Sequence, residues 1–136
     1  MRGREQADES MPRKDRHDYW GAVLDAPDAR ELARFYVELL EWEVYSEDPS
    51  FVTIAPRDGV AYIGFQTSPE YVRPVWPPVE DRQQMMLHLD LEVSDLQAAT
   101  AHAVELGAEL AEHQPQENVR VMIDPVGHPF CLYVDL

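Results

Sequence analysis

Apolar and polar residues alternate along two segments of the chain, residues 18–25 and residues 85–93. A period of two is typical of a β-strand that buries one face and exposes the other. Each segment therefore predicts a strand, and the two lie 67 residues apart in the sequence.

An amphipathic helix is expected after each of these strands. Asp28 with Glu31, and Ser94 with Gln97, have the spacing of an N-terminal capping box. Apolar residues then recur at helical spacing, at Leu32, Phe35, Tyr36, Leu39 and Leu40 in the first helix and at Leu96, Ala99, Ala103 and Leu106 in the second. Gly107 is a natural end for the second helix.

Three further strands are predicted after each helix, at 42–47, 50–55 and 60–66 in the first half and at 109–112, 118–124 and 129–135 in the second. Turn-forming residues separate the last two strands of each half, at residues 57–59 and 124–127. Each half therefore has the order strand, helix, strand, strand, strand.

The two halves also repeat in sequence. At an offset of 67, Leu24 corresponds to Leu91 and Asp28 to Asp95. Two copies are too few for a solenoid, so we interpret the chain as a duplicated module in an α+β fold. Module one spans 17–66, module two spans 85–136, and together they are expected to form one domain.

The remaining segments are predicted to lack regular structure. The connector, residues 67–84, contains four prolines, which exclude a helix or a central strand. Its Tyr71 and Trp76 either attach it to the domain or, in the case of Trp76, cover a pocket. Residues 1–16 are polar and aperiodic and are predicted to be a flexible tail, with docking on a partner as the alternative.

Charge excludes several classes of function. The chain has 136 residues, with 26 acidic against 11 basic ones, and a net charge of −15. This balance excludes general binding of nucleic acids and of anionic membranes. The single cysteine, Cys131, excludes an internal disulfide, and we find neither a membrane helix nor a signal peptide. We therefore expect a cytoplasmic protein.

Two stretches of module two resemble a known superfamily. They are Gln84-Met-Met-Leu-His-Leu-Asp-Leu-Glu-Val93 and Asp124-Pro-Val-Gly-His-Pro-Phe-Cys-Leu132. With the doubled module, they resemble the glyoxalase-like branch of the vicinal oxygen chelate superfamily, which includes glyoxalase I, bleomycin-resistance proteins and extradiol dioxygenases. The resemblance implies a curved, mainly antiparallel sheet around a cup, with both helices outside and homodimers common.

Strand alternation then assigns side chains to the two faces of this expected sheet. Polar and aromatic residues are expected to face the cup, at Tyr62, Gln66, His88, Asp90, Glu92, Cys131 and Tyr133. Apolar residues, such as Leu89, Leu91, Phe130 and Leu132, are expected to face the helices. The cup is therefore predicted to have a polar lining.

The resemblance also implies where a metal ion would be held, at Gly21, Gln66, His88 and Cys131. Glycine offers no ligand there, and cysteine replaces the usual glutamate. We therefore expect no metal cofactor; if one binds, zinc suits the histidine and cysteine best. Without a metal ion, His88 is expected to line the cup and to form hydrogen bonds there. Its neighbour Asp90 can orient the His88 ring. Cys131 is either a nucleophile with His88 as base, or a small wall residue.

Two other residues are candidates for contact with a ligand. Arg120, if it faces the cup with Met122, can bind an anionic group or pair with Asp90 or Glu92; otherwise it is a surface charge. His128 lies either at the rim of the cup or simply in the turn before the last strand.

These residues leave two function hypotheses open. The first is a metal-free protein that binds a small organic molecule, resembling bleomycin-resistance proteins; strong acidity suits a cationic ligand. The second is an enzyme, either a lyase or isomerase resembling glyoxalase I, or a metal-free acid-base catalyst using His88, Asp90 and Glu92.

Overall fold

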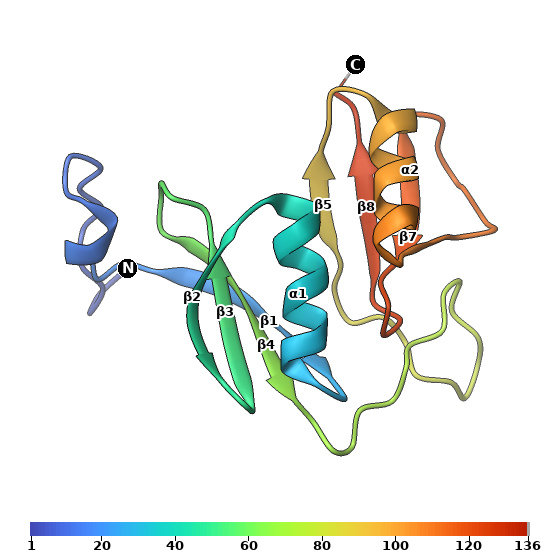
Figure 1. Cartoon of the computed structure of the whole chain (residues 1–136), viewed down its shortest axis with the longest axis horizontal. Coiled ribbons are helices and arrows are strands. Elements are labelled where there is room, and N and C mark those ends of the chain that lie inside the picture. Colours follow the sequence, from blue (N-terminus) through green and yellow to red (C-terminus); the bar gives the residue numbers. More distant parts are fainter. Residues whose placement is uncertain (136) are drawn as a thin grey trace. The chain divides into compact units, whose positions relative to one another are not determined.

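The computed structural model describes residues 1–135, which divide after Pro69 into two compact units (Figure 1). Each unit contains one four-stranded mixed sheet and one α-helix. The predicted α+β class and the duplicated module are therefore confirmed. Neither α-helix is long and apolar enough to cross a membrane.

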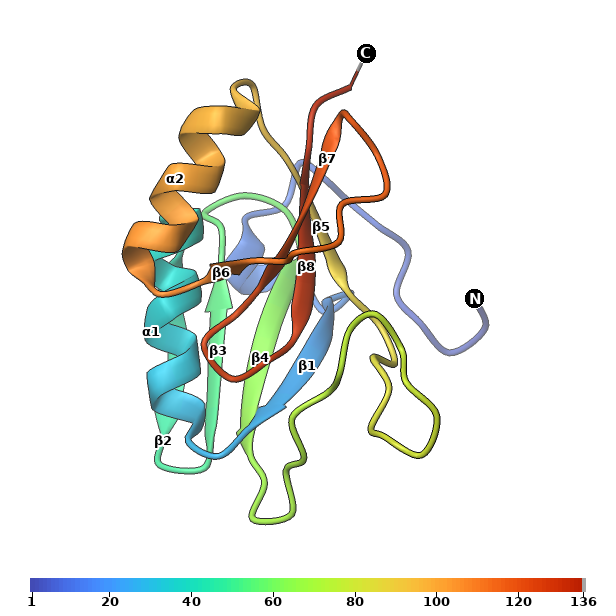
Figure 2. The ribbon, with the colours of Figure 1, turned by 90° about the vertical axis from the view of Figure 1, so that its right-hand side faces the viewer.

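The first unit follows the predicted element order. Its elements are β1 (Trp20–Ala26), α1 (Ala29–Leu40), β2 (Glu43–Asp48), β3 (Phe51–Ala55) and β4 (Ala61–Thr67). The sheet order is β1-β4-β3-β2, with β1 parallel to β4 and the other pairs antiparallel. Helix α1 covers one face of this sheet (Figures 1 and 2).

Helix α1 is held by its cap and by its apolar stripe. The Asp28 carboxylate accepts a hydrogen bond from the Arg30 amide at 3.0 Å, as expected of an N-cap. Leu32, Phe35 and Tyr36 are buried, and the Tyr36 ring stacks on Phe65 of β4 with centroids 5.5 Å apart. The sheet contributes the other side of this core, and its buried residues include Leu24, Ala26, Val52, Ile54, Ile63 and Phe65.

The second unit repeats the topology. Its elements are β5 (Leu89–Glu92), α2 (Leu96–Leu106), β6 (Glu109–Leu110), β7 (Val119–Ile123) and β8 (Pro129–Tyr133). The sheet order is β5-β8-β7-β6, and β5 is parallel to β8 while the other pairs are antiparallel. Phe130, Leu132 and Met122 are buried, and α2 contacts the strands that carry them.

Three expectations for this unit need correction. The strand predicted from residue 85 begins only at Leu89, and β6 has two residues instead of four. The N-cap of α2 is Asp95 rather than Ser94, because the Asp95 carboxylate accepts from the Ala98 amide at 3.0 Å. Gly107 ends α2 as predicted, with φ of 117°, a left-handed conformation that glycine adopts without strain.

The segment that precedes β1 contacts the first unit. The Arg13 guanidinium donates hydrogen bonds to the carbonyl oxygens of Gly59 and Ala61, and it lies over the Tyr19 and Tyr45 rings. Within this segment a short 3₁₀-helix, η1, spans Arg13–Asp15. Part of the predicted flexible tail is therefore packed on the turn before β4.

Candidate functional site

Strand register assigns each side chain of the second sheet to one of its two faces. Residues directly opposite each other on neighbouring strands share a face. Leu91 of β5 pairs with buried Leu132 on the α2 side, whereas Asp90 pairs with Cys131. We call the side opposite α2 the polar face; on β5 and β8 it carries His88, Asp90, Glu92, Cys131 and Tyr133, with His88 placed by its position just before β5.

Three of these side chains form a compact cluster. His88 Nε2 lies 3.0 Å from Asp90 Oδ1, and ligand atoms of His88, Asp90 and Cys131 all lie within 4.8 Å of one another. The His88 and Asp90 side chains are 39% and 59% exposed. The cluster therefore presents an imidazole, a carboxylate and a thiol together, and two of these groups remain open to a ligand.

The surroundings of Cys131 keep its thiol protonated. Burial raises the pKa of the Cys131 thiol, and the charge of Asp90 and its hydrogen bond with the thiol raise it further. A raised pKa keeps the sulfur as a neutral thiol at pH 7, whereas a nucleophilic cysteine needs a lowered one. A protonated thiol is a poor nucleophile, so Cys131 is better interpreted as a residue that lines the polar face and forms hydrogen bonds.

The first unit has no matching cluster at the corresponding positions. Gly21 lies against Tyr62, and a Cβ built on Gly21 would lie 2.5 Å from the Tyr62 carbonyl oxygen and 2.7 Å from its ring. Gln66 is exposed and opposes Asp25 on β1. Tyr62 and Gln66 therefore share one face of this sheet, as predicted, but Tyr62 takes the space that a side chain at position 21 would need.

Two predicted ligand contacts lie elsewhere. Arg120 opposes Leu132, so it is on the α2 side of the sheet rather than on the polar face. Its guanidinium donates to the carbonyl oxygens of Gln116, Glu117 and Val119. Of the two alternatives for Arg120, the one in which it faces the same side as Asp90 does not hold, because β7 pairs with β8 in a register that sends position 120 to the helix side. Its local hydrogen bonds agree with the other alternative, a surface charge.

His128 belongs to the turn between β7 and β8. Its backbone amide donates to the Asp124 carboxylate at 2.9 Å, as do the amides of Val126 and Gly127. Its ring lies 5.4 Å from the Tyr71 ring of the connector. These contacts agree with the interpretation of His128 as a turn residue.

Sequence reasoning missed a groove beside β6. The Trp76 and His113 rings lie 5.6 Å apart, and with them Pro77, Glu109, Glu112 and Ile123 line the groove. Nothing in the spacing of residues 109–113 indicates that the connector comes back to this edge. The contact between the rings agrees with attachment of the connector aromatics to the domain, and the position of Trp76 in the groove agrees with the alternative, in which Trp76 covers a pocket.

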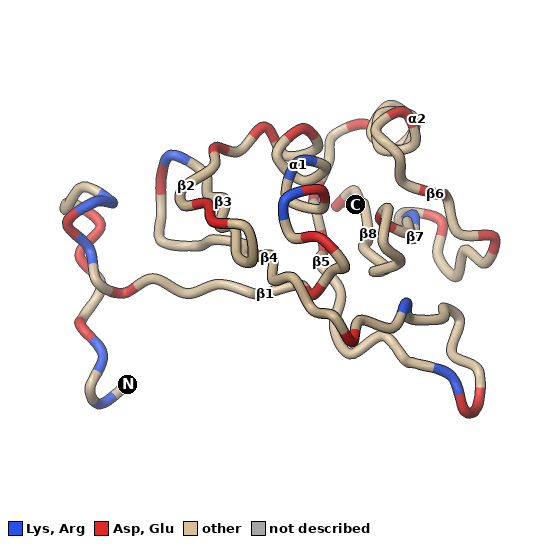
Figure 3. Tube along the Cα trace, turned by 60° about the horizontal axis from the view of Figure 1, so that its bottom comes forward, with Lys and Arg blue, Asp and Glu red and all other residues tan. Residues whose placement is uncertain are grey.

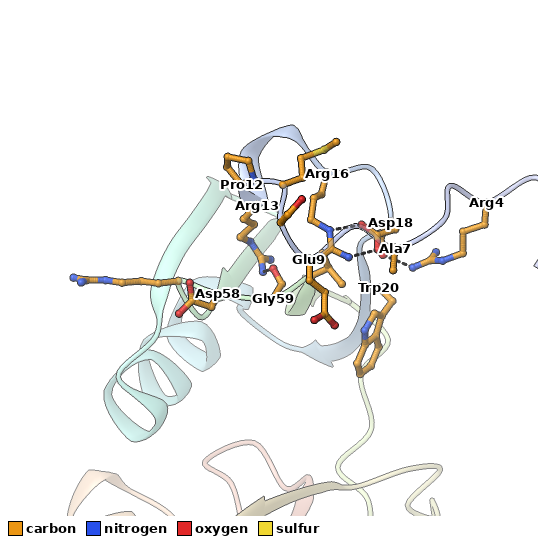
Figure 4. Close-up of a pocket in the computed structure, with 14 residues that line it drawn as sticks. Arg4, Ala7, Glu9, Pro12, Arg13, Arg16, Asp18, Trp20, Asp58 and Gly59 are labelled. Carbon is orange, nitrogen blue, oxygen red and sulfur yellow. Dashed lines mark hydrogen bonds and ion pairs between the residues drawn. The ribbon is translucent and has the colours of Figure 1, made fainter.

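A second cavity, of about 780 Å³, lies beside the segment that precedes β1 (Figure 4). Its arginines are engaged within the first unit, because Arg16 pairs with Asp18 and Arg4 donates to the carbonyl oxygens of Asp18 and Tyr19. The paired Arg16 guanidinium lowers the pKa of the Asp18 carboxyl. We interpret these charges as contacts that hold the segment in place.

Two tandem βαβββ units, with a polar face on the second sheet, are the architecture of the vicinal oxygen chelate superfamily. The sequence model of the glyoxalase-like domain matches residues 21–133, so the chain belongs to the glyoxalase-like domain family. A comparison with curated proteins finds no match.

Solved structures agree on the fold. A glyoxalase/bleomycin resistance protein/dioxygenase family enzyme from Burkholderia phytofirmans is similar with a TM-score of 0.65 and 14% identity, covering 85% of this chain and 97% of that one. A glyoxalase-related enzyme from Fulvimarina pelagi gives 0.59 and 17%, covering 84% and 86%. Lactoylglutathione lyase from Agrobacterium tumefaciens gives 0.55 and 13%, covering 84% and 90%. At these identities the likeness concerns the fold alone.

The residues at the superfamily's ligand positions do not fit its metal ion. Position 21 is a glycine beneath Tyr62, and Gln66 offers a neutral amide. His88, Asp90 and Cys131 are the residues that could hold a soft ion such as zinc. Such an ion would first have to displace the proton that Asp90 helps to keep on Cys131. We therefore assign no chemical step to a metal ion.

Proposed function

We propose that the protein binds a small organic molecule on the polar face of its second sheet, without a metal ion. One observation carries this proposal. His88, Asp90 and Cys131 converge within 4.8 Å, while the Gly21 position lies against Tyr62. Such a site provides donors and acceptors for an organic ligand, but lacks the ligand set of the family's metal centre.

The charge of the chain supports a cationic ligand. The second unit, from residue 70 onward, contains twelve acidic residues and three basic ones. Five of the eleven Lys and Arg residues lie within residues 1–16, and Figure 3 shows blue in this segment. Asp90 and Glu92 belong to the polar face, so a cation there gains both local and long-range attraction.

A binding screen tests this proposal. Planar aromatic amines and cationic glycopeptides would be titrated into chelator-treated protein and followed by calorimetry. We expect submillimolar binding that weakens at least tenfold in Asp90→Asn, since a hydrogen bond to a charged group contributes roughly 1.5–3 kcal/mol and about 1.4 kcal/mol is tenfold. Glu105→Gln, an exposed change on α2, is the matched control and is expected to bind normally.

Two outcomes of the screen would overturn parts of the proposal. If no compound binds at submillimolar concentration, this ligand class is wrong. If binding appears only after zinc is added and disappears in His88→Ala, the metal-free part is wrong.

A second candidate function is metal-free acid-base catalysis. The 3.0 Å contact between His88 and Asp90 favours it, because a carboxylate that orients an imidazole is a common arrangement for proton transfer. Once the screen supplies a ligand, turnover of that ligand is expected to disappear in His88→Ala with the fold retained. An unchanged rate would exclude this candidate.

A further inference from the structure

The cluster of His88, Asp90 and Cys131 brings three different metal-ligating groups together on one sheet. Asp90 of β5 lies opposite Cys131 of β8, and His88 lies on the same face just before β5. The ligand atoms of the three side chains all lie within 4.8 Å of one another, and His88 Nε2 is 3.0 Å from Asp90 Oδ1. All three residues belong to the second unit, so the cluster is complete within that unit.

The spacing of these atoms is close to that around a tetrahedral zinc ion. Zinc binds nitrogen, oxygen and sulfur at about 2.0–2.3 Å, which places its ligands roughly 3.3–3.8 Å from one another. The three atoms would therefore have to shift by roughly 1 Å to hold the ion. The His88 and Asp90 side chains are 39% and 59% exposed, so they can make this shift and leave an open side for a water ligand.

The chemistry of the three groups favours zinc over a hard ion. Imidazole, thiolate and carboxylate all bind zinc, whereas Mg²⁺ and Ca²⁺ prefer oxygen ligands alone. Charge favours any cation here, because the second unit contains twelve acidic residues and three basic ones. A coordinating zinc ion deprotonates a thiol outright, so the proton on Cys131 lowers the affinity for zinc without blocking it.

This arrangement differs from the metal site that the superfamily implies. That site takes its ligands from four positions, which are Gly21, Gln66, His88 and Cys131 in this chain. Gly21 offers no ligand, and Tyr62 takes the space beside it. Asp90 is not one of the four positions, yet it supplies the third group of the cluster. The second unit thus has a ligand set of its own.

A bound ion would change what the polar face attracts. Zinc adds two positive charges and releases one proton, so the cluster becomes more positive by one charge. The ion also occupies the Asp90 carboxylate, which is the group that attracts a cationic ligand in the proposed function. Zinc and an organic cation therefore compete for the same carboxylate.

We propose that His88, Asp90 and Cys131 bind zinc, or a similar soft divalent ion, and that the bound ion excludes the cationic organic ligand. In this step the S–H bond of Cys131 breaks, its proton passes to solvent and a bond forms between zinc and sulfur; nothing is oxidised or reduced. The ion acts as an inhibitor of the polar face and not as a cofactor. The exclusion rests on the proposed function, whereas the metal site does not.

Cobalt tests the metal site, because a thiolate bound to Co²⁺ absorbs in the near ultraviolet. Co²⁺ would be titrated into chelator-treated protein and then displaced with Zn²⁺. We expect the absorption to saturate at a single ion per chain and to fall as zinc replaces cobalt. Cys131→Ser is expected to abolish the absorption, and His88→Ala and Asp90→Asn to weaken zinc binding in calorimetry by about tenfold or more.

Two control variants locate the site. Glu105→Gln removes an exposed acidic group from α2, and Gln66→Ala removes the amide at the superfamily's position in the first unit. Neither variant is expected to change the affinity for zinc. Circular dichroism checks that each variant is folded.

Competition with a dye tests the exclusion. Thioflavin T is a planar aromatic cation whose charged nitrogen has no lone pair to offer zinc, and its fluorescence reports binding. With zinc at about ten times its own dissociation constant, we expect the affinity for thioflavin T to fall about tenfold. Cys131→Ser retains Asp90, so the dye should still bind this variant, and zinc should weaken its binding far less.

The outcomes separate this inference from the proposed function. If the absorption is absent, or if zinc binds His88→Ala and Cys131→Ser as tightly as the unmodified protein, the metal site is wrong and the proposed function stands. If Gln66→Ala weakens zinc binding as much as Asp90→Asn does, the ion is held at the superfamily's positions, and the inference is wrong.

The dye decides the remaining part. If zinc leaves the affinity for thioflavin T unchanged or raises it, the exclusion is wrong. If thioflavin T does not bind at submillimolar concentration with or without zinc, the proposed ligand class is wrong, and the exclusion is wrong with it.

Discussion

At the scale of single residues, Gly21 shows why a familiar position can lose its chemistry. The backbone of β1 pairs with β4 so that Gly21 lies directly opposite Tyr62. The Tyr62 ring folds over the glycine, where any larger side chain would collide with it. The absence of a ligand at position 21 is therefore tied to packing and not only to the identity of one residue.

This packing predicts a cost for Gly21→Ala. The new Cβ would lie 2.5 Å from the Tyr62 carbonyl oxygen, which belongs to the backbone and cannot move independently. We expect the free energy of unfolding to fall by about 1–3 kcal/mol, as in other overpacked sites. Urea denaturation measures it, with Val23→Ala on the same face as control; an equal effect in both would contradict the explanation.

A second residue-scale prediction concerns Cys131. Because its pKa is raised, the thiolate fraction at pH 8 is smaller than for a free cysteine. Alkylation by iodoacetamide should therefore accelerate at higher pH than it does for a free thiol. Asp90→Asn removes one cause of the raised pKa and should shift the profile to lower pH, with several-fold faster alkylation at pH 8.

The control for Cys131 is Glu105→Gln, which changes the charge without touching the thiol. Its alkylation profile should match that of the unmodified protein. An unaltered profile in Asp90→Asn would mean that burial alone raises the pKa.

At the scale of elements, the two helices differ in how they are anchored. Helix α1 buries Leu32, Phe35 and Tyr36, whereas the one buried residue of α2 is Ala103. With so little apolar burial, α2 depends more on its ends. Asp95 caps one end, and Gly107 closes the other with amide hydrogen bonds to the carbonyl oxygens of Ala103 and Val104.

Cap variants test which residue begins α2. Asp95→Ala should lower the free energy of unfolding by about 1 kcal/mol, because the Ala98 amide loses its acceptor. Ser94→Ala, at the position favoured by the sequence pattern, should change it by only a few tenths of a kcal/mol. Thermal denaturation of both variants decides the point, and a larger loss in Ser94→Ala would refute the assignment to Asp95.

At the scale of the whole molecule, the two units have similar topology but unequal cores. The first unit buries large residues on α1 and on three strands, including Tyr36, Phe65 and Ile54. The second relies mainly on Phe130, Leu132 and Met122 beneath a helix rich in alanine. Duplication therefore produced two copies of one topology with different amounts of packed apolar surface.

Hydrogen exchange should reveal this inequality. Amides of α2 and β6 are expected to exchange faster than those of α1 and β3, because fewer apolar contacts oppose their local opening. Exchange followed by mass spectrometry at pH 7 measures both units in one sample. Equal protection of α1 and α2 would show that the smaller core of the second unit does not limit its stability.

The sequence by itself determined the type and order of the elements, the duplicated module and the face on which His88, Asp90 and Cys131 lie. Those features follow from local periodicity, capping and turn residues, which act over a few positions. Tertiary structure decided the rest: the register that turned Arg120 away, the Tyr62 ring over Gly21, and the return of Trp76 to the β6 edge. These contacts join residues far apart in the chain, and local pattern does not contain the pairing of strands or the path of a connector.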